Sequence, residues 1–423
     1  MDTNKCFCVG IDLCSKFSQV TYYSYKEMEP VSVDFSGLKA KYQIPTAVSK
    51  SHGKEEWYAG DEAIKSAALG EAVLVEDILN KVATKNPVSV DDIIIMPIEL
   101  LKIYLDYLLQ VARMAGQSEV IDKVCITLND FNISILSVLK KAMNELGISG
   151  EQLEILSHKE TFIYYVLNQK QEFLKGDAVL FDYGYSGLNV HRMYSVAERG
   201  QRLVLLSSES FEQDIPFSLS ENENSVDLLD FRMREAARLT MDKHNVSTVY
   251  LIGQGFADDI KLNSFIKYVC DRKRVFAGQN LYAKGAAYAA AEGLFVNKAK
   301  DFLIACSERI TTGIEMKISD RGKDKILRMI KPGINWFGAD CSYDFIVDDV
   351  SELEIFLSPV DIREKQLIRI SLEDFPKRVN KATRITVSLS FTSDSRCHLM
   401  VKDRGFGEFF SSSGRVINEE LLL

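Results

Sequence analysis

The chain has 423 residues, of which 46% are hydrophobic and 26% are charged, and its formal net charge is −9 at pH 7. This length indicates two or three lobes, and the composition is that of a globular protein with enough apolar material for buried cores. A negative surface repels phosphate backbones and anionic lipid headgroups, so the charge argues against nucleic-acid and membrane partners.

The eight cysteines are scattered, with no CxxC pair and no spacing along the chain that fits a zinc site. Cys6 and Cys8 would share one face of a strand as two buried thiols. Residues 1–14 lack the pattern of a secretory signal, and no apolar run approaches the ~18 residues of a membrane-spanning helix. We therefore expect a reduced, cytoplasmic protein.

Two distant segments share one strand–turn–strand design. Residues 7–25 form an apolar strand that reaches Asp12, then a polar turn and a returning strand. Residues 179–195 repeat this order around Asp182, with small residues in the turn. Repetition at a spacing of roughly 170 positions predicts an internal duplication.

Helical periodicity and buried strands alternate around these hairpins. Apolar residues at three- and four-residue spacing predict helices over 96–116, 133–147, 157–174, 228–244 and 285–295. Short apolar runs predict buried strands at 124–128 and 249–253. This alternation predicts an α/β domain over residues 1–300.

From about Thr311 the pattern changes to short alternating runs without helices between them. Seven strands are predicted, at 313–318, 326–330, 343–347, 353–357, 367–372, 385–391 and 398–403. This spacing is typical of an antiparallel β-sandwich over residues 310–423. Residues 301–309 would be an apolar linker, or simply a last helical turn and a first strand, and 411–423 a frayed end or a short closing helix.

A nucleotide triphosphate site needs backbone N–H groups near phosphate, carboxylates that hold Mg²⁺ through its waters, and a group that orients the attacking water. Two facing hairpins that end in Asp12 and Asp182 could supply all but the last of these. One such hairpin alone is a weak signal, because aspartate before a turn is common. The pair is more specific.

Motifs along the chain resemble, in order, those of the seventy-kilodalton heat-shock (DnaK-type) chaperones of the actin-like ATPase superfamily. Residues 9–18 resemble the first phosphate motif, 180–190 the second, and 249–262 the adenosine motif. Further similar stretches are 44–49, 59–68, 157–168, 284–291, 311–318, 330–333 and 384–408. The resemblance thus covers nearly the whole chain.

This resemblance implies an α/β actin-like (ribonuclease-H-like, duplicated) nucleotide-binding domain with two lobes at 1–300, followed by a substrate-binding β-sandwich. It implies ATP and magnesium as cofactors and a peptide or protein partner on the β-domain, and an exchange factor could act as a further partner. The family's helical lid has no counterpart here, and the upper lobe is reduced, because only about 70 positions separate Asp182 from Gly253.

The resemblance also assigns roles to individual residues. Asp12 and Asp182 would hold magnesium, Glu160 would orient the attacking water, and Lys16 could supply a catalytic cation. The residues that would contact ATP are Asp12, Ser15, Gly184, Ser186, Gly187, Gly253, Gln254 and Gly255. From the residues alone, Glu160 is a helix-cap acid, Lys16 could face solvent, and the last glycines form an ordinary turn after a strand.

Several positions depart from the family pattern. Cys14 replaces a glycine in the first turn, Tyr185 is bulky where phosphate should approach the main chain, and Asn189 replaces an aspartate. Leu79 stands where the family has a catalytic lysine, and Lys81 follows two residues on. Because the upper lobe is reduced, one wall of the adenine pocket would be missing.

Three arginines of the predicted helix 228–244 could contact the nucleotide or lie on a solvated helix face. They are Arg232, Arg234 and Arg238.

Three hypotheses follow. The leading one is an ATP-binding, chaperone-like protein with weak or slow hydrolysis, in which nucleotide state acts on the β-domain through the joint at 303–306. The second is a degenerate, non-enzymatic scaffold that has lost the nucleotide. The third is an actin-like filament protein, against which the appended β-sandwich argues. A shared fold does not decide among them.

Overall fold

The computed structural model describes residues 6–34, 41–129, 131–198, 201–256, 261–360 and 364–423. The chain forms two compact units. The first unit comprises Met1–Ser195 and Leu206–Asp301, and the second comprises Val196–Leu205 and Phe302–Leu423. The first is mixed α/β and the second is built from strands, so the coarse prediction of an α/β part followed by a β-rich part is confirmed.

The first sheet of the α/β unit has the order β11-β10-β1-β2-β3, and β4 (Ile44–Pro45) adds to β2. Its central strand β1 is parallel to β10 and antiparallel to β2. Strands β10 and β11 are parallel, and β2 and β3 are antiparallel. The strands are β1 (Cys8–Leu13), β2 (Phe17–Ser24), β3 (Glu29–Ser32), β10 (Lys123–Leu128) and β11 (Leu153–Ser157).

The second sheet has the order β16-β15-β12-β13-β14-β17, and its first five strands repeat this topology; β17 is Phe302–Ala305. Its central strand β12 is antiparallel to β13 and parallel to β15, which is parallel to β16. The strands are β12 (Asp177–Gly184), β13 (Gly187–Glu198), β14 (Gln201–Ser210), β15 (Val246–Ile252) and β16 (Arg274–Ala277). The repeated hairpin expected from the sequence is therefore part of a repeated sheet.

Three helices belong to each repeat, placed after the third, fourth and fifth strands of its sheet. They are α3 (Pro97–Gly116), α4 (Ile133–Glu145) and α5 (His158–Leu167) in the first repeat, and α6 (Val226–Met241), α7 (Asn263–Val269) and α8 (Leu281–Ala291) in the second. All five predicted helices are present. The predicted helix 157–174 is shorter than expected, because it ends at Leu167 and a separate 3₁₀ turn covers Gln171–Leu174.

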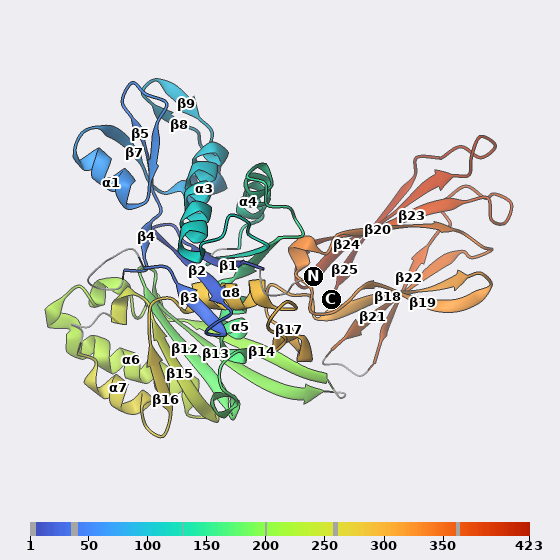
Figure 1. Cartoon of the computed structure of the whole chain (residues 1–423). Helices are drawn as coiled ribbons and strands as arrows, with labels where there is room; N and C mark the ends of the chain where they lie inside the picture. Colours follow the sequence, from blue (N-terminus) through green and yellow to red (C-terminus); the bar gives the residue numbers. More distant parts are fainter. Residues whose placement is uncertain (1–5, 35–40, 130, 199–200, 257–260, 361–363) are drawn as a thin grey trace. The chain divides into compact units, whose positions relative to one another are not determined.

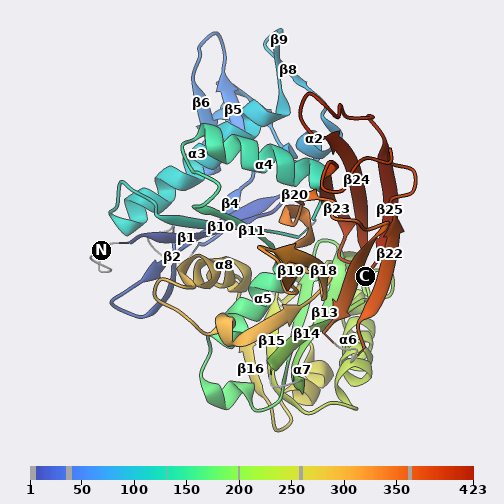
Figure 2. The same ribbon diagram turned by 90° about the vertical axis from the view of Figure 1, so that its right-hand side faces the viewer.

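The last helix of each repeat packs across the centre of the unit. Helix α8 lies on β1, β2, β3 and β10 of the first sheet, and α5 packs directly against α8 (Figures 1 and 2). The other side of α5 reaches the second sheet, where Phe162 and Tyr165 make edge-to-face contacts with Tyr250 of β15. Each sheet is thus covered by the helix that follows the other sheet.

Glycines allow this close packing. A Cβ on Gly10 of β1 would lie 2.3 Å from the backbone N of Ala287, and one on Gly285 would lie 2.0 Å from the carbonyl O of Thr161 in α5. Because backbone atoms occupy both places, no side-chain rotation could relieve the overlap. The small-residue character of 285–295 in the sequence has this physical cause.

Short elements between β4 and α3 form a separate part of the unit. A three-stranded sheet has the order β6-β5-β7, and β8 pairs with β9. The elements are β5 (Val48–Ser51), β6 (Trp57–Ala59), α1 (Asp61–Ala68), β7 (Ala72–Val75), α2 (Ile78–Thr84), β8 (Val88–Val90) and β9 (Ile93–Ile95). Periodicity does not predict these elements, because strands of three or four residues are too short to show it.

The second unit contains two four-stranded antiparallel sheets, with the orders β19-β18-β21-β22 and β20-β23-β24-β25. Their inner faces share one apolar core that includes Ile314, Ile355, Val387 and Leu399. The strands are β18 (Thr312–Asp320), β19 (Lys323–Ile330), β20 (Cys341–Ile346), β21 (Glu352–Pro359), β22 (Gln366–Ser371), β23 (Arg384–Ser393), β24 (Arg396–Gly405) and β25 (Val416–Leu422). All seven predicted strands are present.

Two expectations for this region need correction. The end of the chain is neither frayed nor helical, because Val416–Leu422 forms β25 and pairs along β24. For 301–309 the linker expectation is replaced by its alternative of a last helical turn and a first strand, because a 3₁₀ turn at Ala299–Asp301 leads into β17 (Phe302–Ala305), which pairs in parallel with Arg202–Leu205 of β14. In both cases long-range strand pairing, which local periodicity does not show, determines the structure.

A buried ion pair lies at the end of β24. Both guanidinium NH groups of Arg378 donate to the carboxylate of Asp403 at 2.8 Å, and Asp403 is fully buried. The same carboxylate accepts hydrogen bonds from the backbone N–H groups of Gly405 and Ser413. Arg378 and these donors hold the pKa of Asp403 well below its usual range.

We predict that Gly10→Ala destabilises the first unit, because the added methyl would overlap the backbone of α8. Overpacking of this kind costs about 1–3 kcal/mol or more. Gly150→Ala is the matched control, since a Cβ there would meet nothing within 4 Å. Denaturant unfolding should show a lower midpoint for Gly10→Ala alone, and equal midpoints would contradict the packing described.

We also predict that Asp403→Asn lowers the unfolding free energy of the second unit by about 3–5 kcal/mol, because it leaves the Arg378 charge buried without its partner. The folded pKa of Asp403 is lowered, so its stabilisation is complete well above the ordinary aspartate pKa of ~3.9 and is lost as pH falls through the folded pKa. The difference in unfolding free energy between wild type and Asp403→Asn should therefore become smaller in acid.

Asp324→Asn provides the control for that measurement, because Asp324 pairs with Lys317 on the exposed surface of the same sandwich. Exposed pairs contribute about 0–1 kcal/mol. Urea unfolding of both variants across a range of pH measures the loss. Similar decreases in unfolding free energy for the two variants would contradict the role given to Asp403.

Candidate functional site

A cavity of about 630 Å³ lies in the first unit, at the turns that follow β1 and β12. Asp12 ends the fully buried apolar run of β1, and Asp182 occupies the corresponding place in β12. Eight residues proposed from the sequence line this cavity: Asp12, Ser15, Lys16, Asp182, Gly184, Ser186, Gly253 and Gln254. The structure therefore brings together two turns that are far apart in the sequence.

Three proposed residues do not line the cavity. Glu160 is fully buried at the start of α5, where its Oε2 accepts a hydrogen bond from the backbone N–H of Ser157 at 3.0 Å. The structure places Glu160 as the helix-cap acid of the alternative interpretation and not as a group that faces the cavity. Gly187 and Gly255 serve close packing, since Cβ atoms there would lie 2.8 Å from the Cα of Glu212 and 2.0 Å from the Tyr183 ring.

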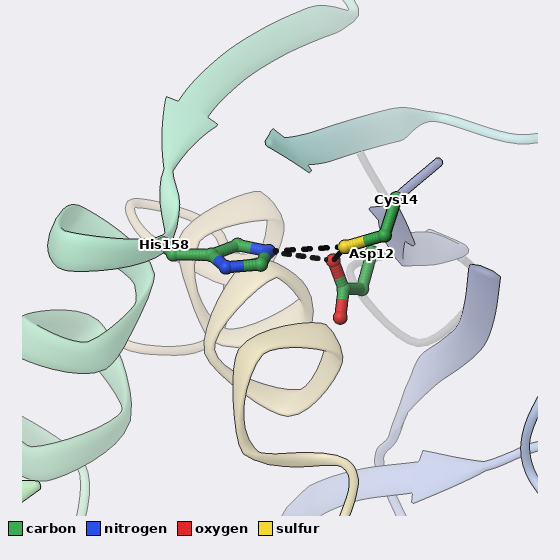
Figure 3. A group of neighbouring side chains, drawn as sticks. All are labelled: Asp12, Cys14 and His158. Carbon is green, nitrogen blue, oxygen red and sulfur yellow. Dashed lines mark hydrogen bonds and ion pairs between the residues drawn. The ribbon is translucent and has the colours of Figure 1, made fainter. Parts of the chain in front are cut away.

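His158 is a residue of this site that the sequence interpretation missed, as it also missed Tyr282. As the first residue of α5, it follows the N-cap Ser157. Its Nε2 lies 2.7 Å from Oδ1 of Asp12 and 3.7 Å from Sγ of Cys14, and the Cys14 thiol donates to the same Oδ1 at 3.3 Å (Figure 3). The one available signal was its position two residues before Glu160, in a segment already singled out by the resemblance.

Tyr282 of α8 connects this cluster to the second aspartate. Its ring stacks on the His158 imidazole, with centroids 3.8 Å apart and planes 16° from parallel. Its hydroxyl donates to Oδ2 of Asp182 at 2.7 Å. Burial raises the pKa of Asp182, while the hydrogen bond from Tyr282 opposes that shift. Burial and the Asp182 carboxyl raise the pKa of Tyr282.

A cation–aromatic contact joins the two turns. The Nζ of Lys16 lies 4.3 Å from the centroid of the Tyr185 ring, a typical distance for this interaction. Tyr185 also contacts the ring of Phe217, 4.8 Å away. Lys16 is an exposed residue whose ammonium also contacts the ring of Tyr185 from the other turn.

Gly253 forms the cavity floor with a backbone that requires glycine. Its φ is +97°, and a Cβ would lie 2.4 Å from the carbonyl O of Tyr183. The side chain of Gln279 donates to the carbonyl O of Gly253 at 3.1 Å, and the backbone carbonyl O of Gln279 accepts from Gln19 Nε2 at 2.7 Å. These bonds connect the floor to the first sheet.

The structure shows where the residues that depart from the DnaK-type pattern lie relative to the cavity. Leu79 and Asn189 line the cavity. Lys81 does not, and its ammonium donates to the carbonyl O of Glu76. The arginines of α6 also lie outside the cavity lining, where Arg238 pairs with Glu235 as expected for a solvated helix face.

The donor set leaves carboxylate oxygens with which the waters of a magnesium ion could form hydrogen bonds. One oxygen of Asp12 contacts His158, and one oxygen of Asp182 accepts the Tyr282 hydroxyl. Each carboxylate thus retains a second oxygen, which suits hydrogen bonds to the hydration shell that Mg²⁺ gives up reluctantly.

We predict that Tyr282→Phe destabilises the first unit by about 1–3 kcal/mol, because Asp182 loses a hydrogen-bond donor in a buried place. The change should raise the pKa of Asp182 further, so the loss should grow as pH rises through that raised pKa and be smaller in acid. Tyr288→Phe is the matched control on the same helix, since no described carboxylate accepts a hydrogen bond from Tyr288. Unfolding of both variants at several pH values tests this, and equal, pH-independent losses would contradict it.

Comparison with known proteins divides the chain into two parts. Residues 29–307 match the C-terminal model of a family of unknown function, DUF5716, and residues 309–423 match a domain of unknown function, DUF8552. A search of curated proteins gave no match. Among the described residues, no helix is both long and apolar enough to cross a membrane. Since the first match covers well over half of the sequence, the chain belongs to the DUF5716 family.

Proposed function

We propose that this chain is an actin-like, DnaK-type protein that binds magnesium-ATP in the cavity of its first unit and hydrolyses it weakly or slowly. One observation carries the proposal. Two sheets that share a five-strand order carry the turns after Asp12 and Asp182, and both turns line one cavity of about 630 Å³. This volume is within the range of ~300–1,000 Å³ for small-molecule sites.

The chain's own residues supply recognisable parts of a phosphate site. The turns at Ser15 and Ser186 offer hydroxyls and backbone N–H groups, and Gly253 lets the main chain approach a ligand. The carboxylates of Asp12 and Asp182 would hold the waters of magnesium, whose charge would offset that of the phosphates. Lys16 is the cation nearest both turns among the described cavity residues.

Weak or slow turnover follows from the same geometry. The Glu160 carboxylate is used in a helix cap, so the group to which the resemblance assigned water orientation does not reach the cavity. Tyr185 fills part of the second turn, and its contact with Lys16 must open before that ammonium can reach a phosphate. Positioning accounts for much of phosphoryl-transfer catalysis, so these departures should reduce the rate strongly.

The second unit would bind a peptide or protein partner. We propose that the protein acts in the cytoplasm. The sheets of the second unit end in β19, β22, β20 and β25, and an extended segment can add to an open strand edge through backbone hydrogen bonds. Nucleotide state would act on this unit through the joint at 303–306, and an exchange factor could assist nucleotide release.

A non-enzymatic scaffold is the second candidate, and specific contacts favour it. Lys16 already has the Tyr185 ring, and Asp12 already has His158, so the polar groups of the cavity are partly satisfied without a ligand. An actin-like filament remains the lesser alternative. Sedimentation with and without ATP would detect it.

The test is calorimetric titration of magnesium-ATP into the full chain, repeated with Asp182→Asn and with Asp227→Asn as the matched control. Asp227 is an exposed acid in the first turn of α6, outside the cavity. Loss of one charge-assisted contact is worth about 1.5–3 kcal/mol, so Asp182→Asn should bind about ten- to a hundredfold more weakly than wild type.

Binding by wild type and by Asp227→Asn, together with weak binding by Asp182→Asn, would support the nucleotide site. A turnover assay should then show hydrolysis that also falls in Asp182→Asn. No heat of binding at millimolar nucleotide, or equal affinities for all three proteins, would overturn the proposal in favour of the scaffold.

A further inference from the structure

Three side chains of different chemistry converge at one end of the cavity. Oδ1 of Asp12, Sγ of Cys14 and Nε2 of His158 lie within 4.8 Å of one another (Figure 3). Asp12 and His158 are buried, and Cys14 is half-buried beside the cavity. Carboxylate, thiolate and imidazole are the three ligand types that Zn²⁺ takes from proteins.

The arrangement differs from that of a nucleophilic triad. In a triad the imidazole accepts from the nucleophile through one nitrogen and donates to the carboxylate through the other. Here both Cys14 and Asp12 approach the same Nε2 of His158. This geometry does not provide a proton relay from sulfur to carboxylate across the two nitrogens of the ring. It does bring three possible metal-ligand atoms within 4.8 Å of one another, and each can bind a metal ion once its proton is lost.

The distances suit a tetrahedral ion. Zinc bonds of the usual length hold neighbouring donor atoms ~3.3–3.6 Å apart at tetrahedral angles. The Cys14 sulfur lies 3.3 Å from Asp12 Oδ1 and 3.7 Å from His158 Nε2, already close to this spacing. Only the distance between Asp12 Oδ1 and His158 Nε2, now 2.7 Å, would have to increase. The hydrogen bond between these two atoms would then be replaced by one metal bond to each of them.

We propose that Asp12, Cys14 and His158 form a binding site for Zn²⁺ or a similar transition-metal ion, with a fourth coordination position open to the cavity. The inference goes beyond the proposed function, because the metal alone would bind whether or not ATP does. Three protein ligands and one open position are the pattern of catalytic rather than structural zinc sites. The fourth position would take a water or an oxygen atom of a cavity ligand.

The surroundings hold the ligands in place. Asp12 is fixed at the end of β1, and Cys14 follows in the turn. His158 is fixed by the first turn of α5 and by the stacked ring of Tyr282. The hydroxyl of that tyrosine binds Asp182, so an outer layer of contacts orients the imidazole, as partners around metal ligands commonly do.

The binding step balances without an oxidant or reductant. Zn²⁺ forms bonds to Asp12 Oδ1, His158 Nε2 and Cys14 Sγ and gives up all of its waters but one, which remains in the fourth position. The thiol of Cys14 loses its proton to solvent, and the proton shared between His158 Nε2 and Asp12 Oδ1 moves to Nδ1 of the same ring or to solvent, so that Nε2 binds through its lone pair. Two further titratable side chains line the same cavity: the carboxyl of Asp182, which accepts from Tyr282, and the ammonium of Lys16, in the same turn as Cys14. Binding should therefore release a proton.

The test is titration of metal-free full-length protein with Co²⁺, followed by Zn²⁺ competition, without nucleotide. Wild type should take up one Co²⁺ with the visible bands of a tetrahedral ion and a sulfur-to-cobalt charge-transfer band, and Zn²⁺ should abolish both. Cys14→Ser should lose the charge-transfer band. Its affinity for Co²⁺ should fall by more than the about 10–100-fold that is typical when a residue outside the ligand set is removed. Cys270→Ser is the matched control, because Cys270 is exposed and lies outside the cluster.

His158→Asn provides a second variant that leaves the sulfur in place, and it should weaken binding while retaining thiol reactivity. Circular dichroism would confirm that each variant is folded. Absence of tetrahedral bands in wild type, an unchanged charge-transfer band in Cys14→Ser, or loss of the band in Cys270→Ser would overturn the proposal. Because no nucleotide is present, a negative result here is distinct from failure of magnesium-ATP to bind.

Discussion

The site depends on the backbone contact between helices α5 and α8. Each helix follows one sheet and packs toward the other, and Gly285 lets α8 approach the carbonyl O of Thr161 in α5. Gly10 lets the same helix lie directly on β1. Because Asp12 is on β1, His158 starts α5 and Tyr282 is in the first turn of α8, this packing also sets the distances within the cavity.

The two carboxylates of the cavity, that of buried Asp12 and that of half-buried Asp182, are stabilised in different ways. Asp12 contacts an imidazole and a thiol, whereas Asp182 has a phenol hydroxyl and a raised pKa. The stacked rings of His158 and Tyr282 lie between them. Isolated carboxylates in such a place would be costly, so the side chains that offset this cost are as much a part of the site as the aspartates.

Sequence patterns predicted those parts of the structure that are local. The strands that carry Asp12 and Asp182 are continuous apolar runs before a turn, and the sandwich strands alternate regularly, so both could be identified. Strand β25 and the short strands between β4 and α3 could not, because pairing with distant strands determines them. His158 was missed for the same reason. It meets Cys14 across 144 positions, and the spacing of cysteines and histidines along the chain gives no sign of that contact.

The two ligands proposed for the cavity make different demands on Asp12. Magnesium would use this carboxylate through water and would leave the contact with His158 intact, whereas zinc would separate the two groups and bind both directly. Cys14 lies in the first turn, where the DnaK-type chaperones have glycine. This single replacement would hinder the approach of phosphate to the main chain and would also supply a sulfur ligand for a metal. A metal with an open coordination position could then attract a phosphate oxygen that the backbone alone no longer holds. The departure that argues against an ordinary ATPase is thus also the feature that gives this cavity a chemistry of its own.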